Sequence, residues 1–350
     1  MKLYSYLLLL VIITSCSTGT SQSWKDLAPP VVGNVWVQPV QGEPAQPIWG
    51  HADGLRIGLA PMPGPRGLLR VYTPYLGHKE GKMINFIALE PIPEGSEHRG
   101  LSELEMSSLD NKHGKRFWSA DDSQSTEQRA ENLPAKGVIS EIGGVQTLTV
   151  FVFSEPFENG TKVYIRLRFY EDKPYEVEIA TFATDDSKPL KNFIITATMG
   201  NYARLRTLHL ADTTVSSLDL WPEYRDSNFA PHAHFPVDDF ITDEGGNAYF
   251  IAAPDEEHPQ TAQYADDTND HWKYYGDLAT QYWYVENPKS DLEGLVNGRF
   301  AYWGSKSPIP GGISFENFEL KAPFSNGAEF VFGVDPAMPE EFIKNLKEKK

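Results

Sequence analysis

Short runs in which apolar and polar residues alternate dominate this 350-residue chain, and Gly, Pro, Asn and Asp bound most of them. A two-residue period of this kind predicts β-strands that bury one face. The clearest runs cover residues 67–72, 146–153, 162–170, 175–182, 192–198, 248–253 and 328–334. Helical periodicity is nearly absent, so the pattern predicts an all-β fold, a large antiparallel β-sandwich or jelly roll.

The run at 162–170 and the run after it predict a hairpin whose register can be derived. One face of the first run carries Phe169 and other apolar residues, and the opposite face carries Arg168. Matching apolar positions across the turn pairs Phe169 with Val177 and Arg168 with Glu178. Because arginines then oppose glutamates, this polar surface is predicted to be a solvated sheet face rather than a sugar platform.

Residues 338–350 carry the one convincing helix signal. Pro339 occupies the first turn, two glutamates follow it near the positive end of the helix dipole, and lysines occupy the last turn. Phe342 and Leu346 share one face of such a helix. We therefore expect a short C-terminal helix that packs on a β domain spanning 31–337.

The first residues resemble an export signal. Lys2 precedes an apolar run that is too short to span a bilayer, and the small residues before Cys16 resemble the lipobox of bacterial lipoproteins. Residues 1–15 are thus predicted to be a signal peptide, Cys16 to carry lipid, and residues 16–30 to form a flexible linker. Cys16 is the sole cysteine, so no disulfide can form and the fold depends on its core.

Acidic residues outnumber basic ones. Removing Lys2 with the predicted signal peptide lowers the 31 Lys and Arg residues to 30, against 48 Asp and Glu, which gives a net charge of −18 with histidine neutral. This balance argues against nucleic acid and against an anionic membrane surface as partners, so lipid on Cys16 is the expected membrane attachment. It also makes clusters of arginine informative.

Three segments, 59–78, 201–234 and 271–287, concentrate arginine, histidine and aromatic residues. Guanidinium groups bind carboxylate or sulfate as a bidentate fork, and flat aromatic rings offer surfaces on which sugars stack. Arg204 and Arg206 lie two apart in a predicted strand and so share a face, with ion pairing to the many acids as the alternative. The predicted substrate-binding residues are Arg66, Arg204, Arg206, Arg225, Trp221, His271 and Trp272.

His232 and His234 share a face if their segment is extended, and three interpretations follow. With Asp238 and Gly245 they match the start of a cupin-like metal pattern, although cupins usually have glutamate at the aspartate position. Beside arginines and tyrosines they match the proton-transfer groups of a β-elimination site. The third interpretation is that they are ordinary polar residues of a loop. We predict proton transfer without a resident cofactor, and a divalent metal is the alternative.

Common catalytic motifs are absent from the sequence, which has no nucleophile elbow, P-loop, HExxH or GxGxxG pattern. A glycosidase with paired carboxylates stays open, with Glu103, Glu105 and Glu316 as its candidates. Spacing along the chain does not determine the distance between carboxylates on which that mechanism depends.

The signal sequence, the β domain and the Trp/Tyr/Arg-rich segments resemble exported lipoproteins that marine Bacteroidota encode in polysaccharide-utilisation clusters. The stretches LAPMPGPRG, RGLSELE and NFAPHAHFP are similar to the oligosaccharide dehydratase type of clusters that degrade ulvan, a sulfated uronate–rhamnose polymer. This resemblance implies an outer-membrane lipoprotein that eliminates water from the terminal uronic acid of an anionic oligosaccharide and leaves a 4,5-unsaturated residue.

Such an elimination needs a group that neutralises the uronate carboxylate, a base near C5 and an acid for the departing C4 oxygen. The predicted carboxylate or sulfate binders are Arg204, Arg206 and Arg225, the base candidates His232 and His234, and the acid candidates Tyr224 and Tyr275. A polysaccharide lyase would use the same set with a sugar as leaving group. A non-catalytic glycan-binding lipoprotein, in which the aromatic residues form a platform, is the competing class.

Overall fold

The computed structural model describes residues 23–78, 82–125, 127–198 and 204–348. The predicted signal peptide, Cys16 and the first part of the predicted linker lie outside these residues. The rest of the linker packs against the domain, because Leu27 is buried and Ala28 forms a β-bridge with Ala45. The folded domain therefore begins a few residues before the predicted boundary at Val31.

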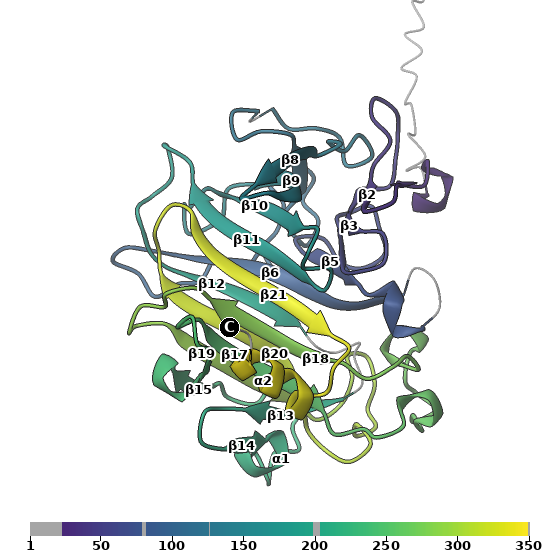
Figure 1. Cartoon of the computed structure of the whole chain (residues 1–350), viewed down its shortest axis with the longest axis vertical. Coiled ribbons are helices and arrows are strands. Elements are labelled where there is room, and N and C mark those ends of the chain that lie inside the picture. Colours follow the sequence, from purple (N-terminus) through teal and green to yellow (C-terminus); the bar gives the residue numbers. More distant parts are fainter. Residues whose placement is uncertain (1–22, 79–81, 126, 199–203, 349–350) are drawn as a thin grey trace, which may run out of the picture.

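The described strands form two large antiparallel sheets that pack together, as predicted (Figure 1). The ten-stranded sheet contains, in spatial order, β1 (Val31–Val32), β2 (Trp36–Gln38), β3 (Ile48–His51), β4 (Arg56–Gly58), β5 (Leu69–Tyr72), β6 (Met83–Pro93), β12 (Leu190–Thr198), β20 (Ser314–Pro323), β19 (Glu293–Arg299) and β15 (Ala233–Pro236). The eleven-stranded sheet contains β14 (Thr214–Ser216), β13 (Leu205–His209), β17 (Ala248–Pro254), β18 (Thr280–Val285), β21 (Ala328–Asp335), β11 (Glu176–Ala183), β10 (Val163–Tyr170), β9 (Val145–Ser154) and β7 (Phe117–Ala120), with β16 (Ile241–Thr242) beside β17 and β8 (Val138–Ile142) beside β9.

All seven predicted runs are strands, namely β5, β9, β10, β11, β12, β17 and β21. The predicted hairpin is β10–β11, and Arg168 pairs with Glu178 as expected. Nη1 of Arg168 donates to Glu178 at 3.1 Å, and Arg166 donates to the same carboxylate at 2.8 Å. This surface is an ion-paired sheet face, as its charge pattern indicated.

The inner faces of the two sheets form one continuous hydrophobic core. Trp49 from the ten-stranded sheet and Trp283 from the other are fully buried. Their indole N–H groups donate to the backbone carbonyls of Ala135 at 3.1 Å and Phe318 at 2.9 Å, so neither polar atom is left unpaired. Each large apolar side chain buried in this way contributes about 1.5–3 kcal/mol, which is the source of stability in a chain without disulfides.

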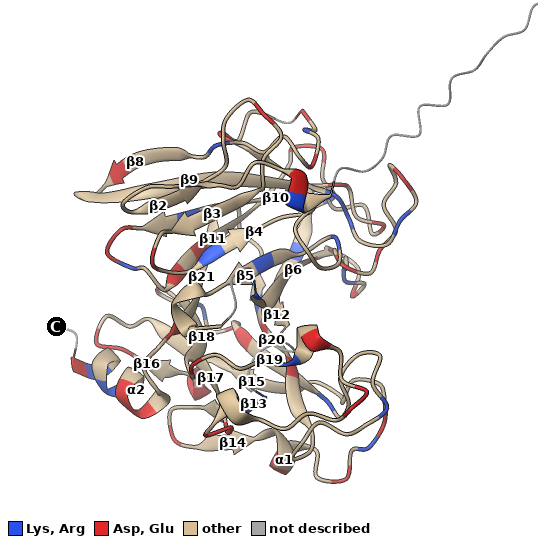
Figure 2. Ribbon diagram, turned by 90° about the vertical axis from the view of Figure 1, so that its right-hand side faces the viewer, with Lys and Arg blue, Asp and Glu red and all other residues tan. Residues whose placement is uncertain are grey.

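The predicted C-terminal helix is α2 (Pro339–Glu348), with acidic residues at its start and lysine at its end (Figure 2). Phe342 and Leu346 pack against Tyr249 and Tyr282 on the outer face of the eleven-stranded sheet. The remaining helical segments are α1 (Ser217–Leu220), η1 (Trp24–Asp26), η2 (Pro74–Leu76), η3 (Val237–Asp239), η4 (Pro259–Thr261) and η5 (Asp270–Trp272). Within the described part of the chain, no helix is long and apolar enough to cross a membrane.

Candidate functional site

The outer face of the ten-stranded sheet carries several polar side chains near its β15 edge. His234, Leu295, Glu319 and Thr196 are register partners across β15, β19, β20 and β12, so their side chains lie on one face. Phe318, the neighbour of Glu319, belongs to the core. Since successive side chains of a strand point to opposite faces, the row containing Glu319 faces away from the core.

A β-bulge in β20 adds a second acid to this face. Val296 pairs with Phe318, but Gly298 pairs with Phe315, so β20 has one extra residue at this point. Both phenylalanines belong to the core, which places Glu316 and its neighbour between them on the outer side. Bulges re-aim side chains in this way beside active sites.

His232, one of the predicted bases, is held by a chain of charged groups. Its Nε2 lies 3.1 Å from Oε1 of the buried Glu319 and 3.4 Å from Nδ2 of the buried Asn297. The second oxygen of Glu319 accepts from Arg99 at 3.1 Å, and Arg99 also donates to Glu90 at 2.9 Å. A carboxylate that holds one imidazole nitrogen orients the ring and leaves Nδ1 for proton transfer.

His234 lies beside this chain of groups but is less constrained. Its ring centre is 6.5 Å from that of His232, and its side chain is exposed. Asp238, the third member of the cupin-like pattern, lies in η3. Among the described residues, no group of three or more His, Cys, Asp or Glu is placed to hold a metal ion. Treatment with a chelator distinguishes a histidine base from a metal ligand here, because it removes a bound divalent ion and leaves a base in place.

Glu90 should make the stability of the fold depend on pH. Burial and the nearby Glu319 raise its pKa to about 7, although Arg99 opposes the rise. The folded state thus keeps a proton that the unfolded chain releases, so the free energy of unfolding falls as pH increases from about 4.5 to about 7. We expect Glu90→Gln to remove about 2–3 kcal/mol of this decline. Urea denaturation at pH 5 and pH 8 measures it, and parallel pH profiles for the two proteins would contradict it.

Arg299, at the end of β19, is a central residue that the sequence interpretation missed. Its Nη2 pairs with Glu316 at 3.2 Å, and its side chain is only 6% exposed. The guanidinium carbon lies 4.7 Å from the ring centre of Phe229, 5.9 Å from Trp272 and 5.4 Å from Trp303. Trp303 is 68% exposed and Phe229 is 44% exposed, so this buried cation is bordered by aromatic surfaces that solvent reaches.

Nη1 of Arg299 is buried and has no hydrogen-bond partner among the described residues. Buried donors are usually paired, yet in the described part of the chain Arg66, Arg166, Arg168 and Arg204 also have unpaired buried nitrogens. Arg299 differs from them because exposed aromatic rings border it, so its Nη1 is the candidate for binding an external acceptor. Asn297 precedes Arg299 by two residues on the same face of β19, a spacing of about 7 Å along a strand. Because Asn297 contacts His232, the free donor and the His232–Glu319 pair lie on the same stretch of the outer face.

Two of the three glutamates considered as paired carboxylates lie near Arg299. Burial and the neighbouring Glu316 raise the pKa of Glu103, and Arg299 opposes the rise. Burial raises the pKa of Glu316 as well, again opposed by Arg299. Glu105 instead forms a buried ion pair with Lys115 at 3.0 Å, which gives it a structural role.

The predicted residues of the 271–287 segment form an aromatic wall beside Arg299. Trp272 is buried and stacks on Tyr302, with ring centres 5.6 Å apart. His271 packs on Trp272 at 4.4 Å. Tyr275 is 47% exposed and touches Tyr264 edge-on at 5.7 Å, and Tyr264 lies 6.3 Å from Tyr302. The structure therefore brings His271 and Trp272 to the site, with Tyr275 at the far end of the wall.

Arg204 and Arg206 are ion-paired, which is the alternative that the sequence left open. Arg204 forms an ion pair with Glu256. It lies directly before β13 and has a φ of 51°, so it is not part of the strand, and the alternation that placed it on one face with Arg206 does not apply to it. Arg206 is 4% exposed, binds Asp255 at 2.9 Å, and donates to the Ile313 carbonyl at 3.2 Å. Carboxylates of the chain engage both guanidinium groups. Arg299 is also ion-paired through Nη2, but its terminal Nη1 has no partner among the described residues, so Arg299 is the candidate for the role of carboxylate binder.

Replacing Arg206 should now affect stability rather than substrate binding. Arg206→Ala removes the hydrogen bonds to the Ile313 and Gly312 carbonyls and the ion pair with Asp255, and we expect a loss of roughly 2–4 kcal/mol in the free energy of unfolding. Arg225→Ala is a matched control on an exposed arginine and should change stability by less than about 0.5 kcal/mol. Chemical denaturation compares the two. An Arg206→Ala protein that is as stable as the parent but binds substrate poorly would return this residue to the binding site.

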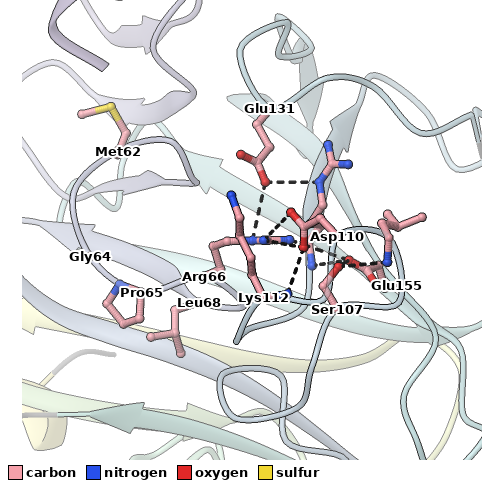
Figure 3. Close-up of polar contacts among 12 residues, drawn as sticks. Met62, Gly64, Pro65, Arg66, Leu68, Ser107, Asp110, Lys112, Glu131 and Glu155 are labelled. Carbon is pink, nitrogen blue, oxygen red and sulfur yellow. Dashed lines mark hydrogen bonds and ion pairs between the residues drawn. The ribbon is translucent and has the colours of Figure 1, made fainter. Parts of the chain in front are cut away.

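Arg66 lies in a separate cluster of carboxylates (Figure 3). Its Nη1 donates to Asp110 at 2.8 Å, and Glu131 and Glu155 lie 3.7 Å and 3.9 Å from its other nitrogens. Glu155 is fixed in turn by the Ser107 hydroxyl at 2.7 Å. Arg66 therefore joins several loops, and its predicted role in substrate binding is replaced by a structural one.

Trp221, Tyr224 and Arg225 lie between α1 and β15. Trp221 packs edge-on against the core residue Phe315 at 6.0 Å, which supports the sheet beneath the site. Arg225 is exposed and donates to the Tyr224 carbonyl at 2.6 Å. Partial burial and Asp226 raise the pKa of Tyr224, which makes it a weaker proton donor than an ordinary tyrosine. These contacts favour neither the acid role for Tyr224 nor the binding role for Arg225.

A groove of about 500 Å³ lies on the outer face of the other sheet, over the β10–β11 hairpin. Its central glutamates already accept hydrogen bonds from the protein: Glu178 from Tyr170 at 2.9 Å and Glu176 from Tyr282 at 2.8 Å. The groove belongs to the ion-paired surface described above. We place the candidate site on the ten-stranded sheet, where titratable groups, exposed rings and an unpaired buried donor converge.

Some of these residues left a signal in the sequence. Asn297 and Arg299 are two positions apart in a run whose alternation is typical of a strand. This spacing alone could have placed both side chains on one face. Glu316 and Glu319 are three apart, a spacing that puts them on opposite faces of a regular strand, and only the bulge brings them to one side. Phe229 and Trp303 come from loops, where no periodicity indicates their position.

Comparisons with known proteins provide no identification. No protein-family model matches the chain, and no curated protein and no solved structure matches it. The functional proposal therefore rests on the chemistry of the site.

Proposed function

We propose that the chain is a carbon–oxygen lyase that eliminates water from the non-reducing-end uronate of ulvan-like oligosaccharides, leaving a 4,5-unsaturated uronyl residue. The observation that carries this proposal is the unpaired, buried Nη1 of Arg299 on the same outer face as the His232–Glu319 pair. We further propose that the protein is exported and anchored in the outer membrane through lipid on Cys16, consistent with the sequence at its N-terminus.

The chemistry of a uronate explains why these two features belong together. The C5 proton is hard to remove while the adjacent carboxylate keeps its full charge, so the site must neutralise that group. Arg299 can donate from Nη1 to the carboxylate, and His232 can accept the C5 proton at Nδ1. In a uronate the carboxyl carbon is bonded to C5, so the carboxylate and the acidic proton belong to one small part of the ligand, and the site needs its cation and its base on the same face, as Arg299 and His232 are.

The exposed rings support a sugar as the ligand. Trp303 and Phe229 border Arg299 and present apolar faces to solvent. Such faces stack on the C–H surface of a pyranose while the polar edge of the sugar reaches the charged floor. Acidic residues outnumber basic ones in this chain, so its surface does not attract anions in general. Arg299 would therefore bind one anionic group at one place.

A glycoside hydrolase is a second candidate, and one observation favours it. Glu103 and Glu316 interact electrostatically, and both have a raised pKa. A raised pKa suits the general acid of glycoside hydrolysis, a role open to Glu103, and the ion pair of Glu316 with Arg299 at 3.2 Å suits the ionised partner.

One assay separates these functions. Purified protein is incubated with oligosaccharides that end in glucuronate, and ultraviolet absorbance, reducing ends and product masses are recorded. A conjugated alkene with the mass loss of one water supports the proposed dehydratase. An alkene with shortened chains indicates a polysaccharide lyase, and new reducing ends without an alkene indicate a hydrolase. Binding without any product indicates a glycan-binding lipoprotein and contradicts the proposal.

A further inference from the structure

The two ring nitrogens of His232 have different surroundings. Nε2 lies 3.1 Å from Oε1 of Glu319 and 3.4 Å from Nδ2 of Asn297, whereas Nδ1 forms no hydrogen bond with any described residue. The side chain of Glu319 is only 1% exposed, so water does not compete at that end of the contact. A neutral imidazole carries its hydrogen on one nitrogen and an electron pair on the other, and the contacts of one nitrogen determine which tautomer forms.

Asn297 and Glu319 favour opposite tautomers of His232. The backbone N–H of Asn317 donates to Oδ1 of Asn297 at 3.1 Å, which fixes the direction of this amide and places its Nδ2, a donor, next to Nε2 of the histidine. A donor at that position favours an electron pair on Nε2. An ionised Glu319 can only accept a hydrogen bond, so it favours a hydrogen on Nε2 instead.

Arg99 decides between these two influences. Its Nη1 donates to Oε2 of Glu319 at 3.1 Å and to Glu90 at 2.9 Å, and a guanidinium that donates to a carboxylate favours the ionised form. Hydrogen bonds that involve an ionised group are roughly twice as strong as neutral ones. The contact of His232 with Glu319 is also shorter than its contact with Asn297. The carboxylate therefore outweighs the amide, and the hydrogen belongs on Nε2.

We propose that Glu319 is a positioning residue that holds His232 in the tautomer with its hydrogen on Nε2 and its electron pair on Nδ1. Arg99 supports this role by keeping Glu319 an acceptor. The tautomer follows from the contacts of the ring, whereas its effect on the reaction rate rests on the proposed elimination, in which Nδ1 is the atom that accepts the C5 proton of the uronate. A histidine with its hydrogen on Nδ1 has no electron pair there and cannot act as this base.

Glu319→Gln should reverse the tautomer without changing the size of the side chain. Arg99 still donates to position 319, so the amide oxygen of the glutamine faces Arg99 and its NH2 group faces His232. Asn297 donates to Nε2 as well, and two donors favour an electron pair on Nε2 and a hydrogen on Nδ1. Combining this change with Asn297→Asp should restore the parental tautomer, because Asn317 binds one oxygen of the new carboxylate and the other oxygen accepts from Nε2.

The tautomer is measured directly by nitrogen NMR of protein labelled in its histidine rings, at about pH 9, where an ordinary histidine is neutral. The signals of His232 are those that disappear in His232→Gln. We expect the hydrogen on Nε2 in the parent, on Nδ1 in Glu319→Gln, and on Nε2 again in the double variant. Glu293→Gln is the matched control and should keep the parental tautomer, because it removes a carboxylate of β19 that pairs with Lys321 at 2.8 Å.

The reaction rate provides the second measurement. On a glucuronate-terminated oligosaccharide, Glu319→Gln should lower kcat about 10²- to 10⁴-fold and leave KM within a few-fold of the parent, since the base is lost and the binding groups are not. The double variant should recover at least about tenfold of this loss. Glu293→Gln should keep the parental kcat.

Each result decides the role of Glu319. A parent protein with the hydrogen on Nδ1 overturns the inference, and so does a folded Glu319→Gln protein that keeps the parental tautomer. If Glu319→Gln does not fold, the spectrum of the parent alone decides. A double variant that regains the tautomer but none of the rate shows that Glu319 does not act through His232, which also overturns the inference. A parent that forms no alkene overturns the proposed elimination, while the spectra still decide the tautomer.

Discussion

Arg299→Met should abolish the distinction between a uronate-terminated oligosaccharide and the same oligosaccharide ending in glucose. The loss of a buried charged hydrogen bond costs about 2–5 kcal/mol, which corresponds to a binding constant lower by roughly 30- to 5,000-fold. Calorimetry with the two oligosaccharides measures this discrimination directly. A variant that still prefers the uronate would place carboxylate recognition elsewhere.

The single substitution will also change stability, and a second variant separates the two effects. Arg299→Met leaves Glu316 buried without its partner, which typically costs about 3–5 kcal/mol. Arg299→Met combined with Glu316→Gln removes both charges, so most of that loss should be recovered. Uronate discrimination should remain absent in the double variant. If discrimination returned together with stability, Arg299 would be a structural residue.

His232→Ala is expected to lower the rate of elimination about 10²- to 10⁴-fold while the melting temperature stays within a few degrees of the parent. The reason is its Nε2 contact with Glu319, which orients the ring and leaves Nδ1 for the substrate. His234→Ala should have a smaller effect, because His234 is exposed and has no such carboxylate partner among the described residues. Steady-state rates and thermal melts of both variants make the comparison, with the exposed His98→Ala as control.

Chelation decides whether these histidines act as bases or as metal ligands. If His232 is a base, treatment with EDTA should leave the rate unchanged, and added divalent ions should not increase it. Activity that disappears with EDTA and returns with a divalent ion would support the metal interpretation. Parental activity in both histidine variants would exclude this segment from the mechanism and move attention to His271, Lys273 and Tyr275.

The sheets could be predicted from the sequence because their signal is local. Alternation over a few residues identified strands such as β10 and β11, and parity across one turn fixed the pairing of Arg168 with Glu178. The start of α2 at Pro339 was equally local. Each of these predictions depended on residues close together in the chain, where period and capping rules apply directly.

The site was harder to predict because it depends on contacts between distant segments. Phe229 and Trp272 meet around Arg299 only through the order of the strands and the paths of the loops. The sequence favoured Arg206 by its spacing, but a carboxylate and backbone carbonyls occupy that guanidinium. An arginine available for a ligand and one used within the fold have the same local pattern, and only their partners distinguish them.

The most direct test of the account is the fate of the C5 proton of the uronate. The protein is incubated with a glucuronate-terminated oligosaccharide that carries deuterium at C5, and the product is analysed by mass spectrometry and NMR. The proposed elimination gives a product that has lost water and the deuterium, has a double bond between C4 and C5, and forms more slowly than from the unlabelled substrate. A product that keeps deuterium at C5 would contradict the account, because no proton would then have been removed from that carbon.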